Sequence, residues 1–183
     1  KNIMKNYYSS LQSSVVLDRG PWGTPVNSKI LKQIIPNPKF IIIYRPVLEV
    51  LASFLQKEKP VDKEMRAFFL MNPDTNGAVI QNLISIKNLL NKGEKVLIIH
   101  YKDLITNFND SLNQIYRFLD LKPFKHKVTN FKQFAMDDTK YDDSVLDADI
   151  HKIKTDKINY KPINVDKILS SIIINKYRNY DVI

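Results

Sequence analysis

The chain has 183 residues, of which 44% are hydrophobic, so it is long enough for one domain with a real core and short for two. Its net charge of +9 suits an anionic ligand, a nucleic acid or an acidic surface, and does not choose among them. The basic residues are spread along the chain without an aromatic RNA-binding signature, so nucleic-acid binding is not the favoured interpretation.

Cysteine is absent, which excludes disulfides and thiolate metal sites and fits a reducing compartment. The three histidines, His100, His126 and His151, are far apart and lack the spacing of a structural zinc site, so no metal is expected. No apolar run approaches the about 18 residues that a membrane span needs, and no charged and then apolar leader opens the chain. The sequence therefore predicts a soluble, cytoplasmic protein without a membrane span.

The first predicted strand covers residues 14–18, and a turn rich in Gly and Pro follows it. Asp18 and Arg19 would then lie at the end of this strand. Trp22 follows in the turn, where it either packs the loop or offers a flat surface to a substrate. A helix is expected over residues 26–35, with Val26, Ile30 and Ile34 on one face.

Residues 39–54 carry the strongest pattern. The run Phe40-Ile41-Ile42-Ile43-Tyr44 predicts a parallel strand buried on both faces, and helical spacing of apolar residues begins at Val47. Arg45 thus lies at the carboxyl end of a strand and beside the amino end of a helix, where α/β sheets bind anions. Ser53 shares a helix face with Glu49 and could join Arg45 at one anion. The alternative is an Arg paired with a carboxylate and a Ser facing solvent.

The later elements continue the alternation of helix and strand. Apolar spacing predicts helices over 62–71, with Met65, Phe68 and Phe69 inward, over 76–91, through 112–119 and over 165–178. A further buried strand is expected over 95–104. The predicted fold class is therefore α/β, with a parallel sheet flanked by helices.

Residues 39–54 resemble a phosphate-binding segment of the PAPS-dependent sulfotransferases of bacterial and viral type, where PAPS is 3′-phosphoadenosine 5′-phosphosulfate. In that family a strand ends in Arg, a Pro follows, and a Ser stands eight residues after the Arg, as Arg45, Pro46 and Ser53 do here. The strand ending in His100-Tyr101 resembles another family segment. The resemblance implies that Arg45, Ser53 and Lys154 hold the 3′-phosphate, that Tyr101 contacts the adenine, and that Asp18 and Arg19 lie at the reacting centre.

The same resemblance implies a P-loop-NTPase-like sulfotransferase fold that is incomplete at its amino end. No phosphosulfate-binding loop is found around the four glycines, so residues 1–183 are expected to be the carboxyl-terminal portion of a longer chain, forming a single sulfotransferase-like domain. The implied reaction is sulfuryl transfer from PAPS, without a metal, to a hydroxyl or amine of a small-molecule or glycan acceptor. Two alternatives stay open: a non-catalytic nucleotide- or anion-binding module, and a P-loop kinase-like phosphotransferase.

Overall fold

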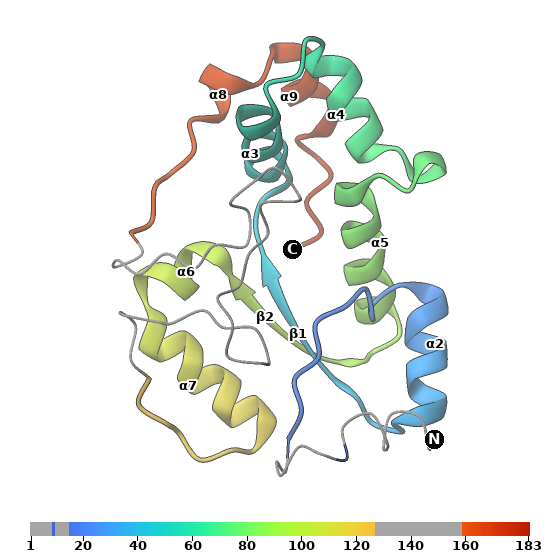
Figure 1. Cartoon of the computed structure of the whole chain (residues 1–183), viewed down its shortest axis with the longest axis vertical. Helices are drawn as coiled ribbons and strands as arrows, with labels where there is room; N and C mark the ends of the chain where they lie inside the picture. Colours follow the sequence, from blue (N-terminus) through green and yellow to red (C-terminus); the bar gives the residue numbers. More distant parts are fainter. Residues whose placement is uncertain (1–8, 10–14, 127–158) are drawn as a thin grey trace. The chain divides into compact units, whose positions relative to one another are not determined.

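The computed structural model describes residue 9 and residues 15–126 and 159–183 (Figure 1). The chain divides into two compact units, the first formed by Lys1–Tyr101 and Pro162–Ile183 and the second by Lys102–Lys161. No helix among the described residues is long and apolar enough to cross a membrane.

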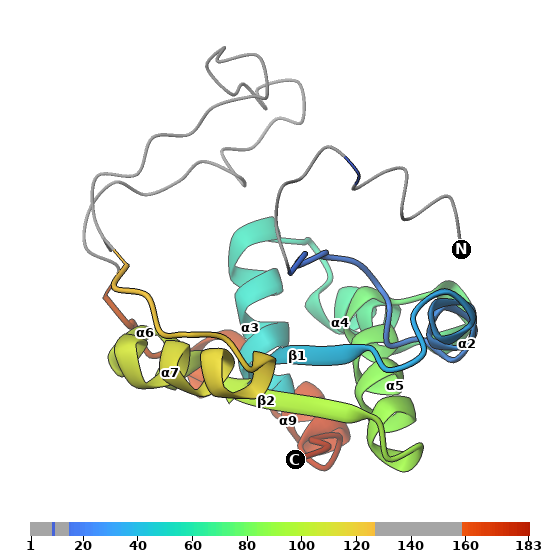
Figure 2. The ribbon, with the colours of Figure 1, turned by 90° about the horizontal axis from the view of Figure 1, so that it is seen from below.

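The first unit is built on two parallel strands, β1 (Lys39–Tyr44) and β2 (Lys95–His100), which lie side by side (Figures 1 and 2). Their register pairs Lys39 with Lys95 and Tyr44 with His100. Parallel strands need a long crossover connection, and here helices supply it. The connection runs through α3 (Val47–Glu58), α4 (Lys63–Met71), the 3₁₀ turn η1 (Pro73–Thr75) and α5 (Ala78–Asn91). The α/β prediction of a parallel sheet flanked by helices is confirmed.

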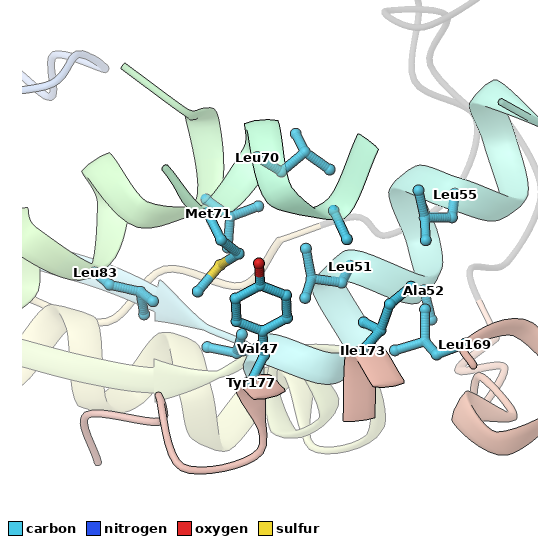
Figure 3. Close-up of a cluster of buried hydrophobic side chains, with 12 residues drawn as sticks. Val47, Leu51, Ala52, Leu55, Leu70, Met71, Leu83, Leu169, Ile173 and Tyr177 are labelled. Carbon is cyan, nitrogen blue, oxygen red and sulfur yellow. The ribbon is translucent and has the colours of Figure 1, made fainter. Parts of the chain in front are cut away.

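The main core forms around α3, because its apolar residues recur at helical spacing and so share one face. Leu51 and Ala52 are fully buried. Two short carboxyl-terminal helices, α8 (Val165–Ile168) and α9 (Ser171–Tyr177), supply further core residues. The α9 side chains Ile173 and Tyr177 lie among those of α3, as Figure 3 shows. The end of the chain is thus an integral part of the core that lies next to β1.

A smaller core holds α2 (Pro25–Ile34) against α5 and the sheet. Leu31, Phe40 and Leu89 are its buried members, and Trp22 packs against them. Of the two interpretations of Trp22, the structure therefore favours loop packing. The Asn88 side-chain amide donates to the Gly23 carbonyl at 2.8 Å and fixes this loop to α5.

Two predictions about strands are wrong. Residues 15–18 form no strand, and Leu17 is 71% exposed, because no neighbouring strand among the described residues pairs with them. The predicted burial of β1 on both faces is also incomplete, since Ile43 is 46% exposed while Phe40 and Tyr44 are buried. The apolar run was correctly assigned as a strand, but β2 is its only partner within the described part of the chain.

Two predicted helices turn a different face inward. On α4, Met65, Phe68 and Phe69 are exposed, and the buried face is Ala67, Leu70 and Met71 instead. On α2, the apolar face of Val26 and Ile30 is exposed, and the buried residues are Ser28 and Leu31. In both helices the small residue, Ala67 or Ser28, allows a close approach to the neighbouring element, so contact geometry decides the buried face rather than side-chain size.

Two element boundaries also differ from the prediction. The helix expected over 165–178 is broken between α8 and α9, where the Ser170 hydroxyl accepts from the Ile173 backbone N–H and begins a new helix. The strand expected over 95–104 ends at His100, and α6 (Tyr101–Thr106) begins at once. The second unit continues with α7 (Phe108–Leu119), which confirms the helix predicted there. Near its end the Tyr116 hydroxyl and His126 Nε2 are 2.5 Å apart.

Candidate functional site

The candidate site lies where β1 and β2 end. Because the strands are parallel and Tyr44 is paired with His100, the next residue of each strand, Arg45 and Tyr101, follows at the same edge of the sheet. The Arg45 guanidinium carbon lies 5.0 Å from the centroid of the Tyr101 ring, a cation–π contact. The structure therefore brings together two of the six residues that the sequence singled out.

Glu49 is the second partner of Arg45. Glu49 lies in the first turn of α3, and its Oε2 accepts from Arg45 Nε at 3.0 Å. The two side chains are only 20% and 26% exposed. This is the carboxylate pairing that the alternative interpretation of Arg45 described. It engages only the Nε edge of the guanidinium, whereas the fork that binds phosphates is formed by the terminal NH₂ groups. Within the described part of the chain these two groups donate no hydrogen bond, so the fork is available to an anion.

Ser53 lies one further turn along α3 and is half-buried. It follows Glu49 at i,i+4 spacing, as Glu49 follows Arg45, so the three residues form a row along one side of the helix. No contact joins Ser53 to Arg45 among the described residues.

The corner between β1 and α3 is held by a residue from the far end of the chain. Asp181 Oδ1 accepts from the Tyr44 hydroxyl at 2.6 Å and from the Val47 backbone N–H at 2.8 Å. Tyr44 is buried, and its burial, together with the neighbouring Asp181 carboxylate, raises the pKa of the Tyr44 hydroxyl above its ordinary range. The first N–H of α3 is thus satisfied by a carboxylate of the protein itself.

A model of the family described as the sulfotransferase domain matches residues 25–180. The chain belongs to the sulfotransferase family. This match confirms the resemblance carried by Arg45, Pro46 and Ser53, and it identifies the edge formed by Arg45 and Tyr101 as part of a sulfotransferase domain. Searches of the curated proteins and of the solved structures gave no significant match.

Two other predicted site residues of this sulfotransferase domain, Asp18 and Arg19, do not follow a strand. Asp18 and Arg19 lie in an exposed segment without regular structure, and neither makes an ion pair with a described residue. Lys154 lies outside the described residues. Across the described ranges no group of three or more His, Asp and Glu is arranged to hold a metal ion.

Sequence reasoning missed two members of the site. Glu49 carried a signal, because it stands four residues after Arg45, the spacing of an ion pair at the start of a helix. Asp181 carried none, since it is separated from Tyr44 by 137 residues. Only the folded chain brings its carboxylate to the end of β1.

Proposed function

We propose that the chain binds PAPS and transfers its sulfuryl group to a hydroxyl or amine of a small-molecule or glycan acceptor. The observation that carries this proposal is the guanidinium of Arg45, fixed by Glu49 and Tyr101 and open at its NH₂ fork, at the carboxyl end of a parallel sheet in a sulfotransferase domain. A half-buried fork of this kind suits a phosphate, which it can bind through two parallel hydrogen bonds.

In this proposal Arg45 binds the 3′-phosphate of the nucleotide, and Ser53 donates its hydroxyl to the same group. Lys154 adds a positive charge, which matters because Glu49 offsets part of the charge of Arg45. Tyr101 lies beside the adenine. Such contacts hold the nucleotide so that the acceptor meets the sulfur in line with the leaving phosphate.

PAPS supplies an activated sulfuryl group when it is bound. Asp18 is proposed to take the proton from the acceptor oxygen or nitrogen as this atom forms its bond to sulfur. The bond between sulfur and the bridging oxygen breaks, and its electron pair stays on the 5′-phosphate of the departing nucleotide. Arg19 is proposed to stabilise the charge that develops on that bridging oxygen.

The direct test is thermal unfolding in metal-free buffer with 3′-phosphoadenosine 5′-phosphate (PAP) or with AMP. A ligand that binds only the folded protein raises its free energy of unfolding, by about 2.7 kcal/mol at a concentration of about 100 times Kd. We expect PAP to raise the melting temperature more than AMP at equal concentration. Equal shifts would remove the reason for assigning Arg45 to a 3′-phosphate.

A non-catalytic nucleotide-binding module remains the second candidate, because Asp18 and Arg19 lie in an exposed segment rather than at a strand end. It predicts the same preference for PAP but no transfer of sulfate from PAPS to any hydroxyl or amine acceptor. A kinase-like phosphotransferase would instead need Mg²⁺ for nucleotide binding. Adding magnesium to the same measurement separates this third possibility, since we expect the PAP shift to be unchanged.

A further inference from the structure

We propose that Asp181 is a positioning residue for Arg45. It does not touch the proposed ligand. It acts by fixing the backbone on both sides of the arginine. The effect on ligand binding rests on the proposed function, whereas the effect on the position of Arg45 does not.

The proposal rests on one carboxylate oxygen that accepts hydrogen bonds from residues on both sides of Arg45. Asp181 Oδ1 accepts from the Tyr44 hydroxyl and from the Val47 backbone N–H, and Arg45 and Pro46 lie between these two residues in the chain. Pro46 has no backbone N–H, so it cannot help to hold this corner by donating a hydrogen bond. Asp181 therefore supplies hydrogen bonds at both ends of the four-residue corner.

The segment that carries Asp181 is itself anchored. Tyr177 is buried in the main core, its ring contacts that of Tyr180 at 5.6 Å between centroids, and Val182 packs against the same core. Anchors thus lie on both sides of Asp181, and Figure 1 shows the carboxyl terminus beside the start of α3. This packing favours a fixed support over a tail that competes with the ligand.

The orientation of Arg45 depends on the corner because the corner sets the position of the arginine backbone relative to its two partners, Glu49 and Tyr101. Glu49 lies on α3, which starts at Val47, and Tyr101 follows the strand paired with β1. A rotation at residues 45–46 would move the guanidinium away from one partner or the other. The carboxylate oxygen of Asp181 opposes that rotation. The family match ends at residue 180 and assigns nothing to Asp181.

The test compares Asp181→Ala, Asp181→Asn and Asp166→Ala, where Asp166 is an exposed acidic residue of α8 and serves as the matched control. Asn keeps a side-chain oxygen that accepts from Tyr44 and Val47, whereas Ala removes it. We expect Asp181→Ala to weaken PAP binding about tenfold, with Asn restoring most of it and Asp166→Ala without effect. Binding by Asp181→Ala that equals or exceeds the wild type would overturn the proposal, and tighter binding would indicate a tail that competes with the nucleotide.

A second measurement needs no ligand. In the nuclear magnetic resonance spectrum, the Arg45 Nε–H signal, identified by its loss in Arg45→Lys, is expected to be displaced by the nearby Tyr101 ring. This displacement should shrink in Asp181→Ala and in Tyr44→Phe, and persist in Asp181→Asn and Asp166→Ala. An unchanged signal in folded Asp181→Ala would overturn the positioning role. The two proposals can fail separately. If the Arg45 Nε–H signal responds to these variants as expected but PAP and AMP bind the wild type equally, the proposed function fails while the positioning role stands.

Discussion

The half-buried side chain of Arg45 is held by two neighbours of different chemistry. Glu49 satisfies the Nε edge and Tyr101 lies against the guanidinium, while the NH₂ fork makes no hydrogen bond within the described part of the chain. A lone arginine on a flexible side chain would lose rotamer entropy on binding an anion, whereas one already fixed loses less. This preorganisation suits the phosphate that we propose as the ligand, although Glu49 reduces the net charge of the site.

Removing the Ser53 hydroxyl tests whether Ser53 binds the same nucleotide phosphate as Arg45. We expect Ser53→Ala to weaken PAP binding by about 1.5 kcal/mol, or roughly tenfold, because a hydrogen bond to a charged phosphate is lost. Ser85→Ala is the matched control, since Ser85 is also half-buried on a helix and its hydroxyl donates to the Gln81 carbonyl of the same helix. Isothermal titration calorimetry of both variants measures the difference. Equal affinities would exclude Ser53 from the site.

Replacing Glu49 by Gln tests the opposing charge. Gln keeps an oxygen acceptor for Arg45 Nε but removes the negative charge, so we expect PAP to bind about threefold more tightly at low ionic strength and the gain to shrink with added salt. Titrations at two salt concentrations measure this. Weaker binding by Glu49→Gln would mean that holding Arg45 with a full charge matters more than the repulsion of the ligand.

For single residues, the sequence predicts those positions that follow from the local pattern of apolar residues. Arg45 and Tyr101 each follow a strong apolar run, so their meeting at one sheet edge could be inferred from two parallel strands alone. The contribution of Asp181 could not, because it depends on the path of the chain between two distant segments. Asp18 and Arg19 were placed by a short apolar run, and such a run does not form a strand without a partner.

At the scale of elements, periodicity predicted where helices lie better than which face they bury. The bounds of α4 and α5 agree with the sequence within a few residues, yet α4 exposes Met65, Phe68 and Phe69 and buries Ala67. A cluster of large apolar residues is not the buried face when a neighbouring helix needs close approach, as α3 does on α4. The break before α9 does not follow from periodicity, because apolar residues continue on both sides of Ser170.

Two glycines give a matched test of the turns that join these elements. A Cβ at Gly77 would lie 2.5 Å from the Leu70 carbonyl oxygen and would also clash with the Phe69 carbonyl, whereas one at Gly93 would meet nothing within 4 Å. Gly93 has a φ of +62°, so alanine there costs only the left-handed backbone penalty, about 1 kcal/mol. We expect Gly77→Ala to lower the free energy of unfolding by about 3 kcal/mol in urea denaturation. Similar losses for the two variants would contradict the close packing of α4 against the start of α5.

At the scale of the whole molecule, the carboxyl-terminal segment and β1 stabilise each other. The Tyr44 hydroxyl is buried against Asp181, and this raises the pKa of the tyrosine in the folded chain above its value in the unfolded chain. The stability that depends on the protonated hydroxyl is then fully present below the unfolded pKa of about 10 and is lost progressively as the pH rises above that value towards the higher pKa of the folded chain.

This linkage predicts a particular alkaline behaviour. The free energy of unfolding of the wild type should fall above about pH 10 more steeply than that of Tyr44→Phe, which has no proton to lose at this position. Tyr180→Phe is the control, because Tyr180 is 40% exposed at the end of the same segment. Urea denaturation at several pH values between about 8 and 11 measures the slopes. Parallel curves for wild type and Tyr44→Phe would show that the hydroxyl is not buried against a carboxylate.

The proposed function depends most directly on Arg45 binding the 3′-phosphate of a nucleotide. Calorimetric titration of wild type and Arg45→Ala with PAP and with AMP tests it, since the two ligands differ only in that phosphate. We expect Arg45→Ala to lose about 2 kcal/mol of affinity for PAP, or roughly thirtyfold, while its affinity for AMP changes by less than about threefold. An equal loss for both nucleotides, or no loss for PAP, would contradict the account.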